Sequence, residues 1–565
     1  MKKTILALFI LTLSANTAVS QVDYPQGYFR NPLDIPILLA GTFGELRSAH
    51  FHSGMDLKTQ QREGLKVYTS AEGYVSRIKI SNWGYGKAIY ITHPNGYTSV
   101  YAHLKKFNKS IEKFVREYQY KKETQEVQLF PKKGQLVVAT NEIIAYSGST
   151  GGFIAPHLHF EIRSTKTEKI INPMLFGLIP PDTKAPIINH LRAYMFNDSS
   201  HVNSSNIEIP IHIKQTTSGT YQADQINAYG KIGFAINTYD QQDGALNKNG
   251  IYKLEMFVNG TKTFEHKLET FSFNESKYVN LLIDYPFYAE HKRKYQKTYI
   301  EPTNKLSTYT KFKEQGFIQI ENELNYLILI KVTDFIGNKS ELTIPVIGKK
   351  ATLKIKKEEL ETPFYIQKSL PKTITLEAIQ ISFPAFTFYD DLYLDISIKD
   401  GIISIHKPLV PLNKSYIVSF NVENFSNKQR EKMYISKIQE NKYYNYSHTI
   451  KTDSVFTTTT RSLGNYKLHS DSEPPIISHC SFYENQNLSK YRFFNIKVID
   501  KLSGLKKYRG EIDGKWVRME LNVKTNTLTF DFNDILLDKG KHSFTLIAMD
   551  NVGNTRTFTS LFILK

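Results

Sequence analysis

Cysteine is almost absent from this chain of 565 residues, which has only Cys480. A single thiol cannot form an internal disulfide, and it cannot build a zinc site of the thiolate type. Cys480 lies in a strand-like run at 476–482, where a small buried hydrophobe is a commoner role than a reactive thiol. We therefore expect Cys480 to be structural, and the mature protein to be indifferent to reducing agents.

Apolar runs long enough to cross a membrane are also lacking, because a spanning helix needs about 20 such residues. The one pronounced run, 5–13, is too short; it follows Lys2 and Lys3 and precedes the small residues at 18–20. This order is typical of a secretory signal. We expect cleavage before Gln21 and export to the periplasm or the extracellular envelope. No cysteine follows that point, so we expect no lipid anchor there.

Acidic residues are in deficit: 54 Asp and Glu stand against 72 Lys and Arg, a net charge of +18. Such a charge favours anionic partners, although a lysine-rich solvated surface explains it equally well. No nucleic-acid-binding module is recognisable and a signal segment is expected, so we expect no nucleic-acid partner. The length suggests three or four domains, and 35 Tyr with 35 Phe favour strands.

The first domain is predicted over 21–180 as a small antiparallel β-sheet. Asn95-Gly96 between two β-rich runs is a strong hairpin signal. The charged insertion 105–133 breaks the pattern, and its first part predicts a surface helix. A glycine-rich loop is predicted at 148–152. Strands are predicted at 66–69, 74–80, 88–92, 97–101, 135–138, 143–146 and 156–162.

The C-terminal half repeats itself. The stretch 182–190 recurs as 471–479, and a strand that ends in a Gly-Asn turn at 332–338 recurs as 548–554. Short strands with regular turns favour β-sandwiches. The predicted modules are an Ig-like β-sandwich at 181–350 with an insertion near 262–320, a β-rich module at 351–470, and an Ig-like β-sandwich at 471–565. The predicted fold class is mainly β.

Histidine and aspartate cluster in the first domain. The segments are His52-Ser-Gly-Met-Asp56, His103 just past a predicted strand, and His157-Leu-His159. Because residues two apart on a strand face the same side, both imidazoles of the last pair enter one cleft. Imidazole and carboxylate hold catalytic zinc, and three protein ligands leave a position open for water. This set supplies three ligands with two histidines to spare.

A single histidine is more often an ordinary core or surface residue, and we leave His50 and His93 in that class. Five such residues at strand ends of one small domain are much harder to attribute to chance.

The stretch from about Gly41 to Pro173 resembles the M23 family of zinc metallopeptidases, also called lysostaphin-like or LytM-like endopeptidases. The motifs that carry the resemblance are 52–56, Tyr101-Ala-His-Leu, Gly148-Ser-Thr-Gly and Pro156-His-Leu-His-Phe-Glu. The resemblance implies one Zn²⁺ per chain, held by His52, Asp56 and His159, with His103 and His157 as catalytic histidines. It also implies a groove in a β-sheet domain and the peptide part of peptidoglycan as substrate. The insertion 105–133 departs from compact members.

Zinc would lower the pKa of bound water to about 7 and polarise the scissile carbonyl. No glutamate base of the His-Glu-x-x-His kind is present, and histidine, with an ordinary pKa near 6.5, is the natural substitute. Which of His103 and His157 is the base stays open.

These observations favour a secreted endopeptidase that cuts cross-links or stem peptides of peptidoglycan. The alternative is a non-catalytic, LytM-like envelope regulator that binds and activates other wall hydrolases. We expect residues 181–565 to be non-catalytic and to position the enzyme in the envelope, either by binding wall or partner proteins or by acting as spacers.

Overall fold

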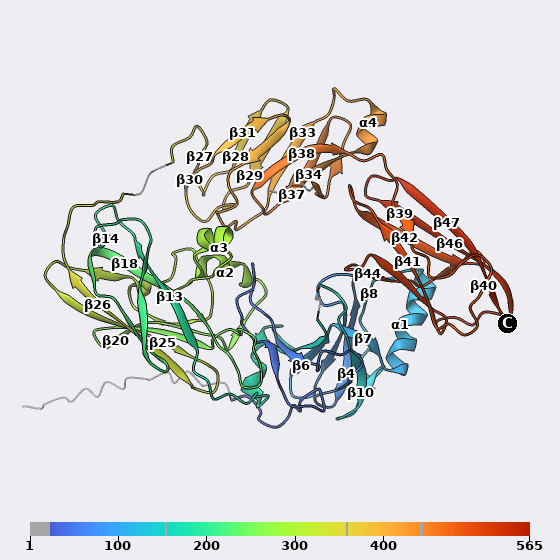
Figure 1. Cartoon of the computed structure of the whole chain (residues 1–565), viewed down its shortest axis with the longest axis horizontal. Helices are drawn as coiled ribbons and strands as arrows, with labels where there is room; N and C mark the ends of the chain where they lie inside the picture. Colours follow the sequence, from blue (N-terminus) through green and yellow to red (C-terminus); the bar gives the residue numbers. More distant parts are fainter. Residues whose placement is uncertain (1–22, 153–154, 357–359, 440–443) are drawn as a thin grey trace, which may run out of the picture.

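The computed structural model describes residues 23–152, 155–356, 360–439 and 444–565. The predicted signal segment lies outside these residues. Within them strands far outnumber helices, which confirms the prediction of a mainly β fold. None of the described helices is long and apolar enough to cross a membrane. Figure 1 shows four strand-rich units that follow one another around a ring, with the last returning beside the first.

The N-terminal unit, with a core that draws on residues 29–178, contains the candidate site. Its main sheet has the order β1-β2-β11-β6-β5-β4-β8, and a second sheet has the order β3-β10-β7. The strands are β1 (Leu39–Gly41), β2 (Met55–Lys58), β3 (Lys66–Tyr68), β4 (Gly73–Ile80), β5 (Lys87–Thr92), β6 (Tyr97–Ala102), β7 (Leu104–Phe107), β8 (Val127–Leu129), β9 (Val137–Val138), β10 (Ile143–Ser147), β11 (His157–Ser164) and β12 (Ile170–Ile171), followed by a 3-10 turn η1 (Pro173–Phe176).

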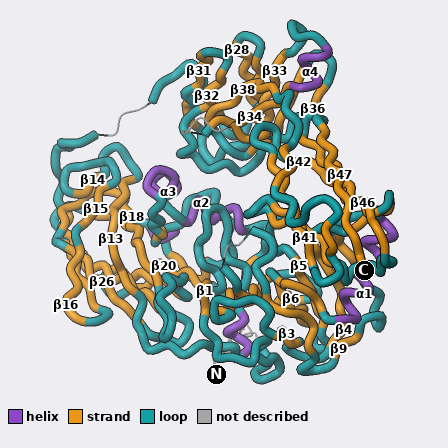
Figure 2. Tube along the Cα trace, turned by 45° about the vertical axis from the view of Figure 1, so that its right-hand side comes forward, coloured by secondary structure: helices purple, strands orange, loops and turns teal. Residues whose placement is uncertain are grey.

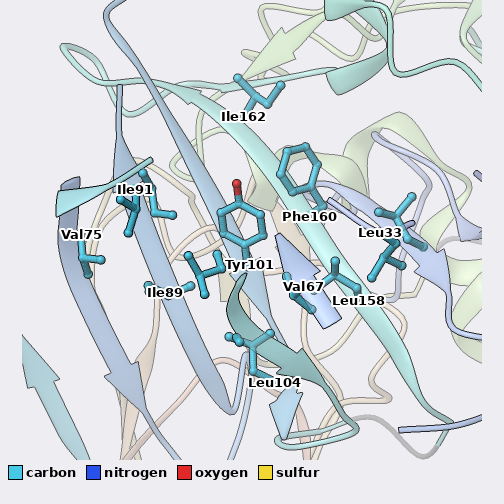
Figure 3. Close-up of a cluster of buried hydrophobic side chains, with 14 of the residues drawn as sticks. Leu33, Val67, Val75, Ile89, Ile91, Tyr101, Leu104, Leu158, Phe160 and Ile162 are labelled. Atoms are coloured by element: carbon cyan, nitrogen blue, oxygen red, sulfur yellow. The ribbon is translucent and has the colours of Figure 1, made fainter. Parts of the chain in front are cut away.

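The predicted hairpin forms between β5 and β6, and Gly96 takes the left-handed backbone conformation (φ +85°) that its turn requires. Strand β11 lies between β2 and β6. Leu158 and Phe160 of β11 enter the buried cluster around Tyr101 (Figure 3). Because side chains alternate along a strand, His157 and His159 face the opposite side, as the spacing predicts.

The insertion after β7 forms helix α1 (Lys109–Lys122), within the range predicted for it. The Asn108 side chain caps its N-terminus by accepting from the Ile111 amide, and Glu123 ends it in a left-handed conformation. Ile111 and Val115 pack into the core of the N-terminal unit. The helix is therefore anchored on one face, and the opposite face contacts the last unit, as described below.

The second unit has a core that draws on residues 188–346. Its elements are β13 (Ile187–Met195), β14 (His201–Val202), β15 (Ile209–Ile211), β16 (Ile213–Thr217), β17 (Thr220–Ala223), β18 (Ile226–Tyr239), β19 (Lys253–Val258), β20 (Thr261–Lys267), β21 (Thr270–Phe271), η2 (Ser276–Tyr278), α2 (Val279–Leu282), α3 (Tyr285–His291), β22 (Gln296–Lys297), β23 (Tyr309–Phe312), η3 (Glu314–Gly316), β24 (Ile318–Ile320), β25 (Asn325–Thr333) and β26 (Lys339–Gly348).

The insertion predicted near 262–320 contacts the N-terminal unit. Strand β21 pairs with β12 and so continues the sheet of the candidate site. The Phe51 amide donates to Ser276 Oγ at 2.9 Å. Phe43 and Phe51 share a buried cluster with Phe271 and its neighbours. The first two units are thus joined by a packed interface as well as by the chain.

The third unit packs a core from residues 366–466 between two five-stranded sheets. Its elements are β27 (Tyr365–Ile366), β28 (Lys372–Leu376), β29 (Ile379–Phe383), β30 (Leu392–Tyr393), β31 (Ile396–Lys399), β32 (Ile402–Ile405), β33 (Tyr416–Asn421), α4 (Asn427–Lys432), β34 (Met433–Ile438), β35 (Tyr444–Tyr446), β36 (Ile450–Lys451), β37 (Val455–Thr460) and β38 (Gly464–Ser470).

The last unit packs a core from residues 482–562 between a four-stranded and a five-stranded sheet. Cys480 is half-buried at the edge of this core, and burial raises its pKa. The boundaries between units remain a prediction. The strands are β39 (Ile476–Ser478), β40 (Gln486–Asn487), β41 (Phe493–Ile499), β42 (Leu505–Ile512), β43 (Lys515–Val517), β44 (Glu520–Asn522), β45 (Thr527–Asp531), β46 (Gly540–Asp550) and β47 (Thr555–Leu564).

The last unit closes the ring against the N-terminal unit, and Figure 2 shows its strands beside α1. Arg518 is buried between them, with Nη1 3.2 Å from Oε1 of Glu112 on α1. Lys87 Nζ lies 2.6 Å from Glu520 Oε1. Lys524 Nζ donates to the Ser149 carbonyl at 2.7 Å, on the glycine-rich loop. The insertion that sequence reasoning treated as a surface helix is therefore the docking face for the end of the chain.

Candidate metal centre

Three predicted ligands converge at one point of the main sheet. Asp56 lies on β2 and pairs across the strands with His159 of β11. His52 precedes β2, and the intervening Gly54 packs against the Phe160 carbonyl, where a side chain would clash. Asp56 Oδ1 lies 3.0 Å from His52 Nε2 and 2.9 Å from His159 Nδ1. The two ring nitrogens are 3.1 Å apart.

Hydrogen bonds orient both imidazoles toward this point. His52 Nδ1 lies 2.7 Å from the Thr42 carbonyl oxygen, which can only accept, so Nδ1 carries the proton and Nε2 the lone pair. His159 Nε2 lies 2.8 Å from Glu161 Oε1. Donation from Nε2 to that carboxylate leaves the lone pair of His159 on Nδ1. Metal-binding histidines are held in this way by carbonyl and carboxylate acceptors.

Glu161 is the residue whose role the sequence did not reveal. It is fully buried and receives hydrogen bonds from Ser53 Oγ at 2.6 Å and from the Tyr85 hydroxyl. Burial alone would raise its pKa, but Arg163 and His159 hold it well below its usual range, so it is ionised. Its signal was its position, two residues beyond His159 on the same face of β11.

The donor set fits zinc. Two nitrogens and one carboxylate oxygen are ordinary zinc ligands, and a tetrahedral ion with bonds of about 2.0–2.2 Å separates its ligands by about 3.3 Å. The observed spacings of 2.9–3.1 Å are a few tenths short of that. Asp56 Oδ2 is held separately by Arg47 Nη2 at 3.2 Å, so Oδ1 alone faces the histidines. Gly41 allows this approach, because a Cβ there would meet both side chains.

Protonation opposes metal binding at this centre. Burial would lower the pKa of His159, but the hydrogen bonds to Asp56 and Glu161 raise it to about 9. Burial would raise the pKa of Asp56, yet the neighbouring histidines lower it well below normal. A proton on His159 would therefore compete with a cation for this position, and binding a metal would release that proton.

His103 and His157 lie beside the three ligands, with ring centroids 4.7 Å apart. His103 Nδ1 donates to the Thr150 carbonyl at 2.9 Å and His157 Nδ1 to the Ala155 carbonyl at 2.9 Å. These bonds place the lone pairs on Nε2. His103 also takes a left-handed conformation (φ +58°), which is strained for a residue with a side chain.

Both histidines are neutral near pH 7. Burial, then the neighbouring His159 and His157, lowers the pKa of His103 to about 3. Burial also lowers the pKa of His157, against the opposing field of Asp56. Neutral imidazoles can accept a proton, which is what a base beside a metal-bound water must do. All five residues predicted from sequence therefore lie in one buried group.

A comparison with family models assigns part of this region to a known family. The family model described as Peptidase family M23 matches residues 50–120, which include His52, Asp56 and His103. The chain contains a peptidase family M23 domain. We use the name M23 domain for the N-terminal unit from here on. His157 and His159 lie beyond the matched range but complete the same group. A second family model, described as Zu5-like domain, matches residues 365–471 in the third unit.

Curated relatives match a little over a quarter of this chain. The DD-carboxypeptidase/endopeptidase Mpg of Neisseria meningitidis serogroup B is 28% identical over 163 residues, 29% of this chain and 28% of that protein. The cell division protein DipM of Caulobacter vibrioides is 25% identical over 160 residues, 28% of this chain and 22% of that protein. The matches thus cover 28% and 22% of the length of these two relatives.

Two solved structures match a similar share of the chain. The catalytic domain of the antimicrobial peptidase lysostaphin from Staphylococcus simulans is 26% identical, covering 27% of this chain and 91% of that one, with a TM-score of 0.17. A zinc containing peptidase from Vibrio cholerae is 25% identical, covering 26% of this chain and 40% of that one, with a TM-score of 0.20.

Proposed function

We propose that this protein is an exported zinc metalloendopeptidase that cuts the peptide part of peptidoglycan. The observation that carries the proposal is the convergence of His52 Nε2, Asp56 Oδ1 and His159 Nδ1, each within 3.1 Å of the other two. One Zn²⁺ per chain would be held there. When bound, it would polarise the scissile carbonyl and acidify a water molecule.

The residues around the ligands have separate tasks. Thr42 and Glu161 keep the two ligand imidazoles in the correct tautomer. The backbone carbonyls of Thr150 and Ala155 do the same for His103 and His157. One of these two neutral histidines would take the proton of the attacking water. The other would donate to the developing oxyanion or to the leaving amine, and either order fits this geometry.

The substrate is proposed from the family and its relatives. The name of the Neisseria relative describes carboxypeptidase and endopeptidase activity, and the M23 motifs imply murein peptides. An M23 domain followed by 385 residues of β-rich chain (565 minus 180) favours a large, immobile substrate. We propose that residues 181–565 are non-catalytic and contact wall or envelope proteins, with export directed by the predicted signal segment.

The alternative is a non-catalytic regulator of other wall hydrolases. The Caulobacter relative is named for cell division rather than for hydrolysis. Against this alternative, all five site residues are present, buried and oriented.

Muropeptide mass spectrometry distinguishes these functions. The mature chain 21–565, loaded with zinc, is incubated with purified sacculi, and the released fragments are identified. We expect fragments cut at a peptide bond. His159→Ala should release none, whereas His448→Ala, at an exposed histidine in the third unit, should match the wild type. Release of no fragment by a zinc-loaded, folded wild type would favour the regulator.

A further inference from the structure

Each sandwich predicted from the internal repeat contains a cluster of three aspartates. Asp182, Asp240 and Asp334 form the first and Asp471, Asp500 and Asp550 the second, and within each cluster one oxygen of every residue lies within 4.8 Å of the others. The clusters occupy equivalent positions of the repeat, since 182–190 recurs as 471–479 and 332–338 as 548–554. Neither contains the histidine ligands of the M23 domain.

The two clusters also share their supporting hydrogen bonds. Asp334 Oδ1 accepts from the amides of Gly337 and Asn338, and Asp334 Oδ2 accepts from Asn338 Nδ2 at 2.7 Å. Asp550 repeats this pattern: Oδ1 accepts from the amides of Val552 and Asn554, and Oδ2 from Asn554 Nδ2, also at 2.7 Å. One aspartate of each cluster is therefore held in place by the turn that follows it.

Two residues at the first cluster have buried side-chain oxygens without a partner in the described chain. Gln242 is 4% exposed, and its Oε1 has no hydrogen-bond partner among the described residues. Gln242 lines one small cavity together with Asp182 and Asp240. Asp240 is 2% exposed and its Oδ1 is likewise unpartnered within the described chain. Because an unmade hydrogen bond to a buried oxygen is costly, these oxygens indicate a ligand.

The second cluster has a matching feature. Ser503 is fully buried, and its Oγ finds no partner in the described part of the protein. Its backbone amide donates to Asp471 Oδ2 at 3.0 Å, which places the residue against the cluster. Asp471 and Asp550 are themselves fully buried. Both clusters thus combine close carboxylates with a further buried, uncommitted oxygen.

Within the described chain, the charges of the first cluster are balanced only in part, by Lys184. Lys184 Nζ donates to the Gln242 carbonyl and lies 3.9 Å from Asp243, outside the triad. The carboxylate oxygens of Asp182, Asp240 and Asp334 lie within 4.8 Å of one another, so their negative charges repel. A divalent cation among the three carboxylates would remove this repulsion and supply the missing partner of Gln242.

We propose that each aspartate cluster binds one Ca²⁺ ion, so that the chain carries two calcium sites besides its zinc site. The choice of ion follows from the donors. Carboxylate, amide and hydroxyl oxygens are ligands for hard cations, whereas zinc prefers the nitrogen-containing set of the M23 domain. Irregular clusters that mix side-chain types suit the flexible coordination of Ca²⁺ better than the strict octahedron of Mg²⁺.

Both sites lie where one unit meets the next. The cavity beside Asp182 and Asp240 is also lined by Thr42 of the M23 domain. The Gly250 amide donates to Thr42 Oγ1 at 3.0 Å, and the Thr42 carbonyl holds His52. At the second site, the Asp471 amide donates to the Lys432 carbonyl at 2.9 Å, and Lys432 Nζ reaches Asn554, the neighbour of Asp550. The two ions would therefore stiffen two joints of the ring.

Equilibrium dialysis of the mature chain tests the proposal. The protein is dialysed against micromolar to millimolar Ca²⁺ at constant Zn²⁺, and bound metals are counted by mass spectrometry. We expect two Ca²⁺ per wild-type chain, one in Asp240→Asn, one in Asp500→Asn and none in the double variant. Asp198→Asn and Asp453→Asn, at exposed aspartates, should keep two. His159→Ala should also keep two while losing zinc, which separates this result from the proposed function.

Thermal melts with and without Ca²⁺ guard against misfolded variants. If the clusters bind calcium, the ion should raise the Tm of the wild type and raise it less in each Asn variant. Two results overturn the proposal. One is a wild type that binds no Ca²⁺, or binds Mg²⁺ in its place. The other is an Asp240→Asn chain that melts at or above the wild-type Tm in the presence of Ca²⁺, which would mean that Asp240 is simply protonated.

Discussion

Glu161 Oε1 lies 2.8 Å from Nε2 of His159, on the nitrogen opposite the one that faces Asp56. This contact makes the carboxylate a positioning group for a proposed zinc ligand. Its own surroundings, with Ser53, Tyr85 and Arg163 all bonded to it, keep it ionised and immobile.

Replacing Glu161 with Gln should weaken zinc binding by about 10–100-fold, the usual cost of removing such a partner. A competitive chelator titration measures the affinity. Glu168→Gln, at an exposed position beyond the end of the same strand, is the matched control. An unchanged zinc affinity in a folded Glu161→Gln chain would show that the contact does not tune the site.

Replacing His159 with Ala should remove zinc and activity together, because two remaining ligands hold the ion poorly. Zinc content by mass spectrometry and muropeptide release are measured on the same sample. Full zinc occupancy in this variant would refute the ligand assignment.

Replacing His103 with Ala should have a different effect. Zinc should stay bound, because His103 is outside the triad, while kcat falls by about 10²-fold or more if it performs acid–base work. His157→Ala should behave similarly. Relief of the left-handed strain at His103 is a separate effect, and a melting curve of His103→Asn, which tolerates that conformation, controls for it. Loss of zinc from either variant would contradict these roles.

Replacing Arg518 with Ala should open the ring. The change leaves Glu112 on α1 without its buried guanidinium partner from the last unit, a loss of about 3–5 kcal/mol for a buried ion pair. Small-angle scattering should show a larger radius of gyration, and the last unit should be cleaved from the chain more readily by protease. Arg556→Ala, at an exposed arginine of the same unit, should change neither. An unaltered scattering profile for Arg518→Ala would mean that other contacts suffice.

Acid should destabilise the protein partly through His266, which lies in the interface between the first two units. Burial lowers its pKa from 6.5 to about 3, so the unfolded chain binds the proton first. The stability that neutral His266 contributes is full above pH 6.5 and falls toward pH 3, by about 1.4 kcal/mol per pH unit. His266→Gln should flatten this slope in urea melts between pH 6 and 4, and the exposed-site variant His448→Gln should not. Equal slopes in all three would contradict the prediction.

The sequence by itself determined the local features. Asn-Gly between β-rich runs dictates a hairpin whatever surrounds it, and spacing by two residues puts His157 and His159 on one face of β11. The residue types of the five predicted site residues indicated zinc chemistry. The apolar runs of the chain are too short to predict a membrane-spanning helix. Each of these inferences depends on a few neighbouring residues, whose local backbone geometry does not require the rest of the fold.

Only the tertiary structure decided the contacts between distant segments. Sequence placed Glu161 on the correct strand, but its role depends on Ser53 and Arg163 meeting it in space. The helix of the insertion was predictable from its sequence. Its contact with Arg518 was not, because that contact exists only where the last unit lies beside the first. The repeated segments that contain the aspartates were visible in the sequence. The aspartates lie close together only because the packing of each sandwich brings separate segments together. Burial, strand register and charge balance depend on contacts between distant segments, so a local sequence pattern cannot predict them.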